Sequence, residues 1–232
     1  MVTGAAEVIR LERVEAHHGR TLALTDMNLT VNAGTVVSVI GPNGAGKSTL
    51  FALLAQRLKP TAGVVAVDGA VADVLQGTNI DPHLQLTVDD VVRMGRFRAR
   101  GFLRPMRRRD RVIVDEAIER VGLADLRRRP INQLSGGQRQ RALVAQGLAQ
   151  GAPIMLLDEP TTGLDLPAQD VILETMRAEA DAGRTVLFST HDLGHAAQAD
   201  VVVALACTCV CCAPPTAALE APEVVALFDS AA

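Results

Sequence analysis

A glycine-rich run in the first quarter of the chain carries residue types that bind phosphate. It comprises Gly41, Pro42, Asn43, Gly44, Ala45, Gly46, Lys47, Ser48 and Thr49. Glycines let backbone N–H groups approach phosphate oxygens without a Cβ in the way. A lysine in this position can reach the β- and γ-phosphates of a nucleotide, and the hydroxyl after it can bind Mg²⁺. The run therefore predicts a site for ATP and Mg²⁺, with Ser48 as a metal ligand.

Two adjacent carboxylates further along the chain have the chemistry to complete such a site. Asp158 and Glu159 follow the apolar run 154–157, which is typical of a central parallel strand buried on both faces. Consecutive residues of a strand point in opposite directions, so the two acids can serve different purposes. We expect Asp158 to hold the Mg²⁺ ion and Glu159 to act as the general base that activates water.

The flanking sequence indicates which elements position the glycine-rich run. A β-branched run at 36–40 precedes it, and leucines spaced by three and four follow it between Leu50 and Leu58. These patterns predict a strand, a loop and a helix, which is the setting that a P-loop requires. The N-terminus of the helix would add its partial positive charge to the phosphate site. The sequence thus predicts an α/β fold of the P-loop NTPase type.

A second helix start in the chain points to a narrower family. The motif consists of Ser135, Gly136, Gly137 and Gln138, preceded by Leu134. Ser135 is a favourable N-cap for a helix that continues to about residue 148, and such a helix end is a second anion-binding group. The motif resembles the signature of the ABC ATPase family. In that family the signature of one subunit completes the nucleotide site of the other, so that two chains hold two ATP molecules head to tail.

The resemblance covers residues from about 11 to 205 and implies roles for further residues. Gln76 lies at the position of the Q-loop, where it would bind Mg²⁺ and sense the γ-phosphate. Residues 163–165 resemble the D-loop, which crosses the dimer interface. His191 follows a strand predicted at 186–190 and matches the catalytic switch histidine. His18 occupies the position where the family usually has an aromatic ring that stacks on adenine, and the chain has no Trp or Tyr.

The family also implies the architecture of the whole chain. We expect a single ABC ATPase domain over 1–232, with a mostly parallel central sheet and an antiparallel β portion before it. A helical subdomain at roughly 78–150 should be inserted into this core. The last hairpin normally turns on glycine or charged residues, whereas this chain has Ala206-Cys207-Thr208-Cys209 there.

The segment between Gln76 and the signature favours one branch of the family. Residues 86–96 and the basic stretch 100–104 are similar to manganese and zinc importers. Importers of ferric siderophores, haem and cobalamin have a similar segment, and 160–165 fits them at least as well. We expect import of a metal ion or metal chelate. The implied partners are a second copy of the chain, integral-membrane permease subunits and an extracytoplasmic solute-binding protein. The chain would be peripheral, at the cytoplasmic face of the membrane.

Other functions remain open at this point. The first is a transporter subunit for a solute without metal, and the second is an ABC ATPase without a transport role, of the iron–sulfur assembly type. A P-loop kinase for a small molecule is disfavoured by the signature and by the Asp158-Glu159 pair. The net charge of −3 does not indicate a nucleic-acid partner.

Arginines are concentrated in one stretch of the chain. Nine of them fall between Arg93 and Arg111. They would form either a solvated helix face or a surface that docks on the permease or on anionic lipid.

The last part of the chain is apolar. Residues 201–219 carry no charge, but Pro214-Pro215 would break a membrane helix there, and 201–203 is typical of a buried strand. All four cysteines lie at 207–212, where they would be buried thiols or soft metal ligands.

Overall fold

The computed structural model describes residues 6–19, 21–74, 85–101 and 105–229. Its strands are β1 (Glu7–His18), β2 (Thr21–Asn32), β3 (Val36–Ile40), β4 (Ala62–Val67), β5 (Val71–Val74), β6 (Ile154–Leu157), β7 (Thr185–Ser189), β8 (Val201–Leu205) and β9 (Cys209–Ala213). Its α-helices are α1 (Lys47–Leu54), α2 (Val88–Arg100), α3 (Arg108–Arg120), α4 (Gly136–Gln150), α5 (Leu166–Asp181), α6 (Leu193–Ala196), α7 (Pro215–Leu219) and α8 (Pro222–Asp229).

A six-stranded sheet forms the centre of the molecule. Its strand order is β5-β6-β7-β3-β8-β9, and every neighbouring pair is parallel except β8 and β9. All residues of β3, β6 and β7 are buried, as expected for strands that are covered on both faces. The mostly parallel central sheet predicted from the sequence is confirmed.

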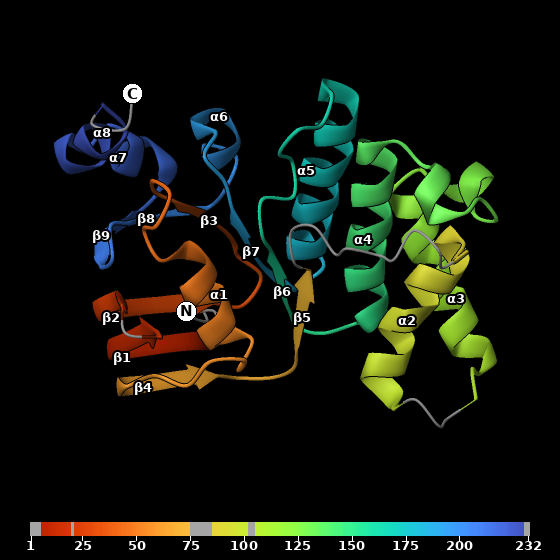
Figure 1. The fold of residues 1–232 in the computed structure, drawn as a ribbon, viewed down its shortest axis with the longest axis horizontal. Helices are drawn as coiled ribbons and strands as arrows, with labels where there is room; N and C mark the ends of the chain where they lie inside the picture. The colour runs from red at the N-terminus through yellow and green to blue at the C-terminus, as the bar shows by residue number, and fades with distance from the viewer. Residues whose placement is uncertain (1–5, 20, 75–84, 102–104, 230–232) are drawn as a thin grey trace, which may run out of the picture.

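A three-stranded antiparallel sheet, in the order β2-β1-β4, covers one side of this core. Helix α1 lies between the two sheets (Figure 1), and its Leu50 and Phe51 pack in one apolar cluster with residues of β1, β2 and β3. Gly63 allows β4 to approach β1, because a Cβ there would lie 2.3 Å from the carbonyl oxygen of Arg13. The antiparallel β portion before the core is also confirmed.

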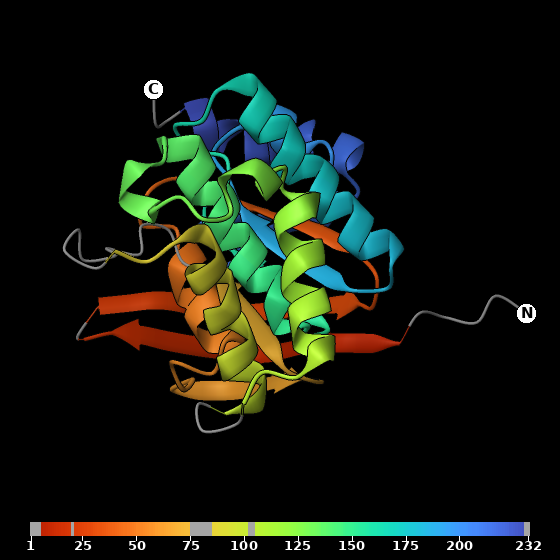
Figure 2. The same cartoon turned by 90° about the vertical axis from the view of Figure 1, so that its right-hand side faces the viewer.

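Helices cover the opposite face of the central sheet. Figures 1 and 2 show α5 and α4 over the strands, with α2 and α3 further out. Two glycines permit the close packing of α4. A Cβ on Gly147 would lie 2.5 Å from Cγ2 of Val74 in β5, and a Cβ on Gly95 would lie 2.3 Å from the carbonyl oxygen of Gln146. In chain order, α2, α3 and α4 all fall between β5 and β6.

The apolar stretch 201–219 folds into β8, β9 and α7, and Pro215 lies in the first turn of α7. Within the described ranges, no helix has the length and apolar character needed to cross a membrane. The turn between β8 and β9 places Cys207 at φ 62°. This conformation favours glycine, which explains why a cysteine in this hairpin is unusual.

Candidate functional site

The P-loop runs from the end of β3 to the start of α1 and is held in a conformation that requires glycine. Gly46, the N-cap of α1, has φ 98°. A Cβ on Gly46 would lie 2.6 Å from Cδ2 of Leu24 and 2.7 Å from the carbonyl oxygen of Ala23. A Cβ on Gly41 would lie 2.4 Å from the carbonyl oxygen of Leu205. The loop is therefore confined between β2 and the end of β8.

Lys47 is oriented into this loop. Its side-chain Nζ donates to the carbonyl oxygens of Gly41 at 2.6 Å and Pro42 at 3.1 Å. The residue is only 8% exposed, and burial lowers the pKa of Lys47, although the charges of Glu159 and Asp158 favour its protonated form. These two bonds hold the ammonium group inside the loop, where it could contact the oxygens of a bound phosphate.

Asp158 lies beside the P-loop at the carboxyl end of β6. The Ser48 hydroxyl is 3.4 Å from Oδ2 of Asp158. On the other side, the Ser189 hydroxyl donates to Oδ1 of Asp158 at 2.5 Å and accepts from the backbone N–H of Glu159 at 2.8 Å. A hydroxyl and a carboxylate at this separation are hard oxygen ligands of the kind that Mg²⁺ prefers, so the residues present fit the ion.

Glu159 has an unusual backbone conformation for a residue with a side chain. Its φ is 47°, a left-handed value that costs a non-glycine residue about 1–3 kcal/mol. Oε2 of Glu159 accepts from the Thr162 hydroxyl at 3.0 Å and lies 3.9 Å from Nδ1 of His191. The His191 side chain is 63% exposed. The structure thus brings together the predicted base and the predicted switch histidine.

A cavity of about 510 Å³ contains both the P-loop and the two acids. It is lined by Thr21, Leu22, Ala23, Asn43, Gly44, Ala45, Gly46, Lys47, Ser48, Thr49, Asp158 and Glu159. The sequence reasoning missed Thr21, Leu22 and Ala23, which start β2. Leu22 is a large apolar side chain that is 44% exposed beside the phosphate loop. His18 pairs with Thr21 across the β1–β2 turn, and its side chain is outside the described part of the structure.

The signature residues lie elsewhere in the chain, at the N-terminus of α4. The Ser135 hydroxyl accepts from the backbone N–H of Gln138 at 3.2 Å, and the Gln138 side chain accepts from the N–H of Ser135 at 3.1 Å. This reciprocal pair is a capping box. Ser135 and Gly136 are exposed, and none of residues 135–138 lines the P-loop cavity.

Two further predicted motifs have different outcomes. Gln76 falls within 75–84, outside the described residues. In the D-loop segment, Gly163 has φ 71° and Asp165 caps α5 by accepting from the N–H of Ala168 at 3.1 Å. The next residue, Leu166, is 73% exposed. This segment therefore ends in an apolar side chain that is open to solvent in the isolated chain.

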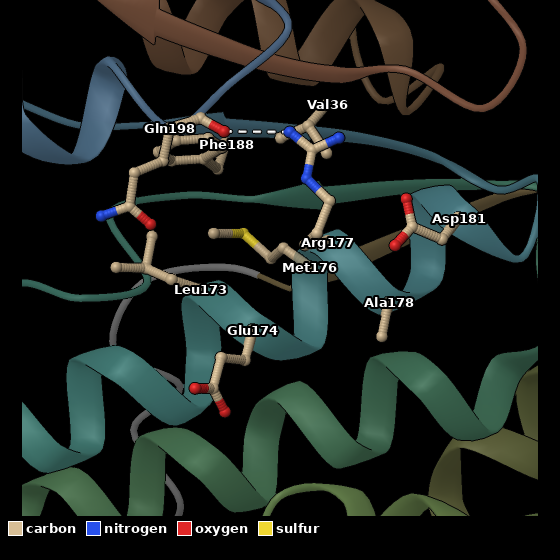
Figure 3. A pocket seen from close by; sticks show the side chains of 9 residues that line it. All are labelled: Val36, Leu173, Glu174, Met176, Arg177, Ala178, Asp181, Phe188 and Gln198. Carbon is tan, nitrogen blue, oxygen red and sulfur yellow. Dashed lines mark hydrogen bonds between the residues drawn. The ribbon is translucent and has the colours of Figure 1, made fainter.

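A second cavity, of about 350 Å³, lies between α5 and the central sheet. Figure 3 shows Leu173 and Met176 beside Phe188 and Val36, with Arg177 directed toward the backbone oxygen of Gln198, to which it donates at 2.9 Å. None of the predicted site residues lines this cavity.

The cysteine hairpin contacts the P-loop through the backbone of Cys207 and through its thiol, which donates to the carbonyl oxygen of Gly44 at 3.9 Å. The N–H of Cys207 donates to the carbonyl oxygen of Ala45 at 3.0 Å, and its own carbonyl accepts from Thr25 at 2.7 Å. Among the described residues, no three His, Cys, Asp or Glu side chains converge in a way that would hold a metal ion. Burial raises the pKa of Cys209 to about 11, with further contributions from Cys212 and Cys211.

Comparisons with known proteins agree with this geometry. Residues 24–162 match the ABC transporter family. The chelated iron transport system membrane protein YfeB of Yersinia pestis is 40% identical over 191 residues, which is 78% of this chain and 64% of that protein. The manganese transport system ATP-binding protein MntA of Synechocystis is 40% identical over 187 residues, which is 76% of this chain and 72% of that protein.

Solved structures give the same result. An inward-facing ABC transporter assigned to the metal-chelate type superposes with a TM-score of 0.86 at 28% identity, over 97% of this chain and 90% of that one. A dimeric ATP-binding cassette bound to ADP and Pi superposes with a TM-score of 0.77 at 28% identity, over 89% of this chain and 98% of that one. The chain therefore belongs to the ABC transporter family and carries that family's ATP-hydrolysing cassette.

Proposed function

We propose that this chain powers the import of a metal ion or metal chelate by hydrolysing ATP as one half of a head-to-tail dimer. One observation carries the ATPase part of the proposal. Asp158 and Glu159, which follow the end of β6, line the same cavity as Lys47 and Ser48. The proposed base and metal ligand therefore lie beside the phosphate-binding loop.

The residues divide the work according to their chemistry. The amides of 41–49 and the Lys47 ammonium bind the β- and γ-phosphates. Glu159 accepts the proton of the attacking water, and its position is fixed by the Thr162 hydroxyl and by the hydrogen bond from its own N–H to Ser189. Nδ1 of His191 lies 3.9 Å from Oε2 of Glu159. This side chain stabilises the negative charge that develops on the γ-phosphate.

Mg²⁺ would be held by the Ser48 hydroxyl and the Asp158 carboxylate, and Gln76 is proposed as a further ligand. When bound, the ion neutralises charge on the β- and γ-phosphate oxygens. Ser189 orients Asp158 for this purpose, because its hydroxyl donates at 2.5 Å to Oδ1, the carboxylate oxygen that does not face Ser48.

The exposed signature supports the dimer. Ser135, Gly136, Gly137 and Gln138 do not line the chain's own cavity, so the γ-phosphate that they would contact belongs to a second copy. We propose that 1–232 is one ATPase domain and that the helical subdomain at roughly 78–150 docks on integral-membrane permease subunits. The chain would then be peripheral, at the cytoplasmic face of the membrane. An extracytoplasmic solute-binding protein would deliver the cargo.

The support for a metal cargo comes from similar proteins. The names of the two similar proteins given above refer to chelated iron and to manganese, and both share 40% of their matched residues with this chain. A transporter for a non-metal solute and an iron–sulfur assembly ATPase are the alternatives that the test must separate.

The test is carried out in proteoliposomes that contain the chain and its permease. ATPase activity and uptake of radiolabelled Mn²⁺ or ferric chelate are compared between wild type, Glu159→Gln and the control Glu174→Gln, an exposed acid on α5. Glu159→Gln should lower hydrolysis by about 10²–10⁴-fold and abolish uptake, while the control stays normal. ATPase activity that neither manganese nor any ferric chelate stimulates would contradict metal import but leave the ATPase assignment intact.

A further inference from the structure

A basic cavity of about 460 Å³ lies away from the nucleotide site, and we call it the arginine pocket. Its polar lining comprises Arg96, Arg107, Arg109, Asp110, Gln150 and Arg184. These residues come from the C-terminal half of α2, the start of α3, the end of α4 and the residue before β7. The pocket is therefore lined both by helices and by the residue that precedes a strand of the central sheet. None of the described residues that line it also lines the P-loop cavity.

The innermost guanidinium is fixed by several bonds. The Arg96 side chain is 12% exposed, and its Nε and Nη2 donate to Oδ1 of Asp110 at 3.2 and 3.1 Å. Its Nη1 donates to the carbonyl oxygens of Ala149 at 2.7 Å and Gln150 at 3.2 Å. Arg96 thus satisfies the last carbonyls of α4, and Asp110, the only carboxylate among the described residues that line the pocket, is engaged with it.

The guanidinium of Arg184 is held by a buried acid. Arg184 pairs with Glu179 of α5, whose side chain is 1% exposed and which also pairs with Arg120 of α3. Because Glu179 is buried between two arginines, it holds Arg184 at the wall of the pocket. The pocket is therefore bordered on two sides by arginines in fixed positions.

The remaining two guanidiniums are available. Arg107 and Arg109 are exposed, and among the side chains that the structure describes no carboxylate pairs with either of them. The charge of Arg109, after burial, contributes to a lowered pKa of Arg96. Like charges are thus gathered in one concave site without enough acids to neutralise them.

We propose that the arginine pocket binds a small polyanion that carries phosphate groups. Guanidinium groups present paired N–H donors that match two phosphate oxygens, and they stay charged at any physiological pH. The cavity volume falls in the range of ligand sites, about 300–1,000 Å³. A solvated helix face would not require a concave site whose base is an arginine that is 12% exposed and makes four hydrogen bonds. The phosphates belong either to a free metabolite or to a lipid headgroup.

The binding test uses inorganic tripolyphosphate as the probe, in metal-free buffer of low ionic strength. A Lys47→Ala background weakens the competing P-loop site. Two double variants are compared by titration calorimetry: Arg107→Gln with Arg109→Gln, and the control Arg108→Gln with Arg111→Gln. The control removes two exposed arginines from the same helix that do not line the pocket. The pocket variant should bind at least about tenfold more weakly than the control, because two charge-assisted contacts are lost.

A second arm identifies the source of the phosphates. Co-sedimentation is measured with vesicles of phosphatidylglycerol in phosphatidylcholine and with vesicles of phosphatidylcholine alone. Tripolyphosphate binding that depends on the pocket pair supports a free metabolite. Vesicle binding that depends on the pocket pair, without tripolyphosphate binding, supports a lipid headgroup.

Two results would overturn the proposal. One is equal loss in both double variants, which would indicate delocalised attraction to the arginine-rich stretch. The other is binding of neither probe by the control variant. Arg107→Lys with Arg109→Lys covers the case in which the glutamine pair does not fold. It keeps both charges but loses the paired guanidinium donors, so it should bind tripolyphosphate more weakly than the control Arg108→Gln with Arg111→Gln, and equal binding by the two would count against the pocket.

Discussion

The two glycine-rich helix starts of this chain, at α1 and α4, differ in how their N-termini are used. At α1 the N-cap is Gly46, which has no side-chain cap, and Lys47 lines a cavity that also contains two acids. At α4 the N-cap is Ser135, whose hydroxyl already accepts from the N–H of Gln138. The first helix start thus faces a cavity that contains a lysine and two acids, whereas the second is exposed and none of its residues 135–138 lines that cavity.

The surroundings of the two helix starts differ in the same direction. The P-loop is tied down by β2 and by the β8–β9 turn, because a Cβ on Gly46 would meet Leu24 and Cys207 bonds to Ala45. Around Gly136 a Cβ would meet nothing within 4 Å. The constrained loop before α1 is expected where a chain binds its own nucleotide. The unconstrained start of α4 is expected at a surface that contacts another molecule.

The largest effect should come from removing the cation at the first helix start. Lys47→Ala eliminates a charged contact to the phosphates, which typically costs about 2–5 kcal/mol, or roughly 30-fold or more in the Kd for ATP. The control is Lys59→Ala, which removes the chain's other lysine, an exposed one. Titration calorimetry with ATP should show a loss for the first variant only. Equal affinities would mean that the cavity does not bind the phosphates.

A matched pair of alanine substitutions tests the difference in rigidity. Gly46→Ala forces a Cβ into contacts of 2.6 and 2.7 Å at φ 98°, so the free energy of unfolding should fall by about 2 kcal/mol or more, and ATP binding should weaken. Gly136→Ala should leave the free energy of unfolding unchanged or raise it by up to about 1 kcal/mol. Urea denaturation of both variants gives these values. A comparable loss at Gly136 would show that the second helix start is as constrained as the first.

The smallest effect concerns the turn that braces the P-loop. Cys207→Gly relieves a φ of 62° that costs about 1–2 kcal/mol, offset by about 0.5–1 kcal/mol of extra chain entropy in the unfolded state. We expect a net gain of about 0.5 kcal/mol in urea denaturation, with unchanged ATP affinity. Cys211→Gly, inside β9, is the control and should be destabilising. Destabilisation by Cys207→Gly would mean that the thiol, and not the backbone, braces the loop.

The motifs could be predicted from the sequence because each is contiguous and carries its own local geometry. The P-loop needs only a strand, glycines and a helix start, and Ser135 with Gln138 is a capping pattern within one turn. The fully apolar run 154–157 predicted one buried parallel strand, and the resemblance to the ABC ATPase family implied the mostly parallel sheet around it. These features depend on neighbours in the chain, which the sequence displays directly.

Other parts of the site depend on contacts between distant segments and were not predictable. Thr21, Leu22 and Ala23 reach the cavity only because β2 folds back on β1 and lies against the P-loop. Glu159 adopts a left-handed conformation, and its N–H donates to the Ser189 hydroxyl, 30 residues further along the chain, a contact that no local pattern reveals. The arginine-rich stretch is visible in the sequence, but its concave arrangement arises from the packing of α2, α3 and α4 with Arg184.

The most direct test of the head-to-tail arrangement is the mass of the Glu159→Gln variant in solution, measured by light scattering with saturating ATP and Mg²⁺. Binding should survive and hydrolysis should stop, so ATP should hold two chains together and the mass should double. Adding Ser135→Arg to the same chain should restore the monomer, because a bulky cation would fill the position of the partner's γ-phosphate. A Glu159→Gln variant that stays monomeric in saturating ATP, or a dimer that tolerates Ser135→Arg, would contradict the account.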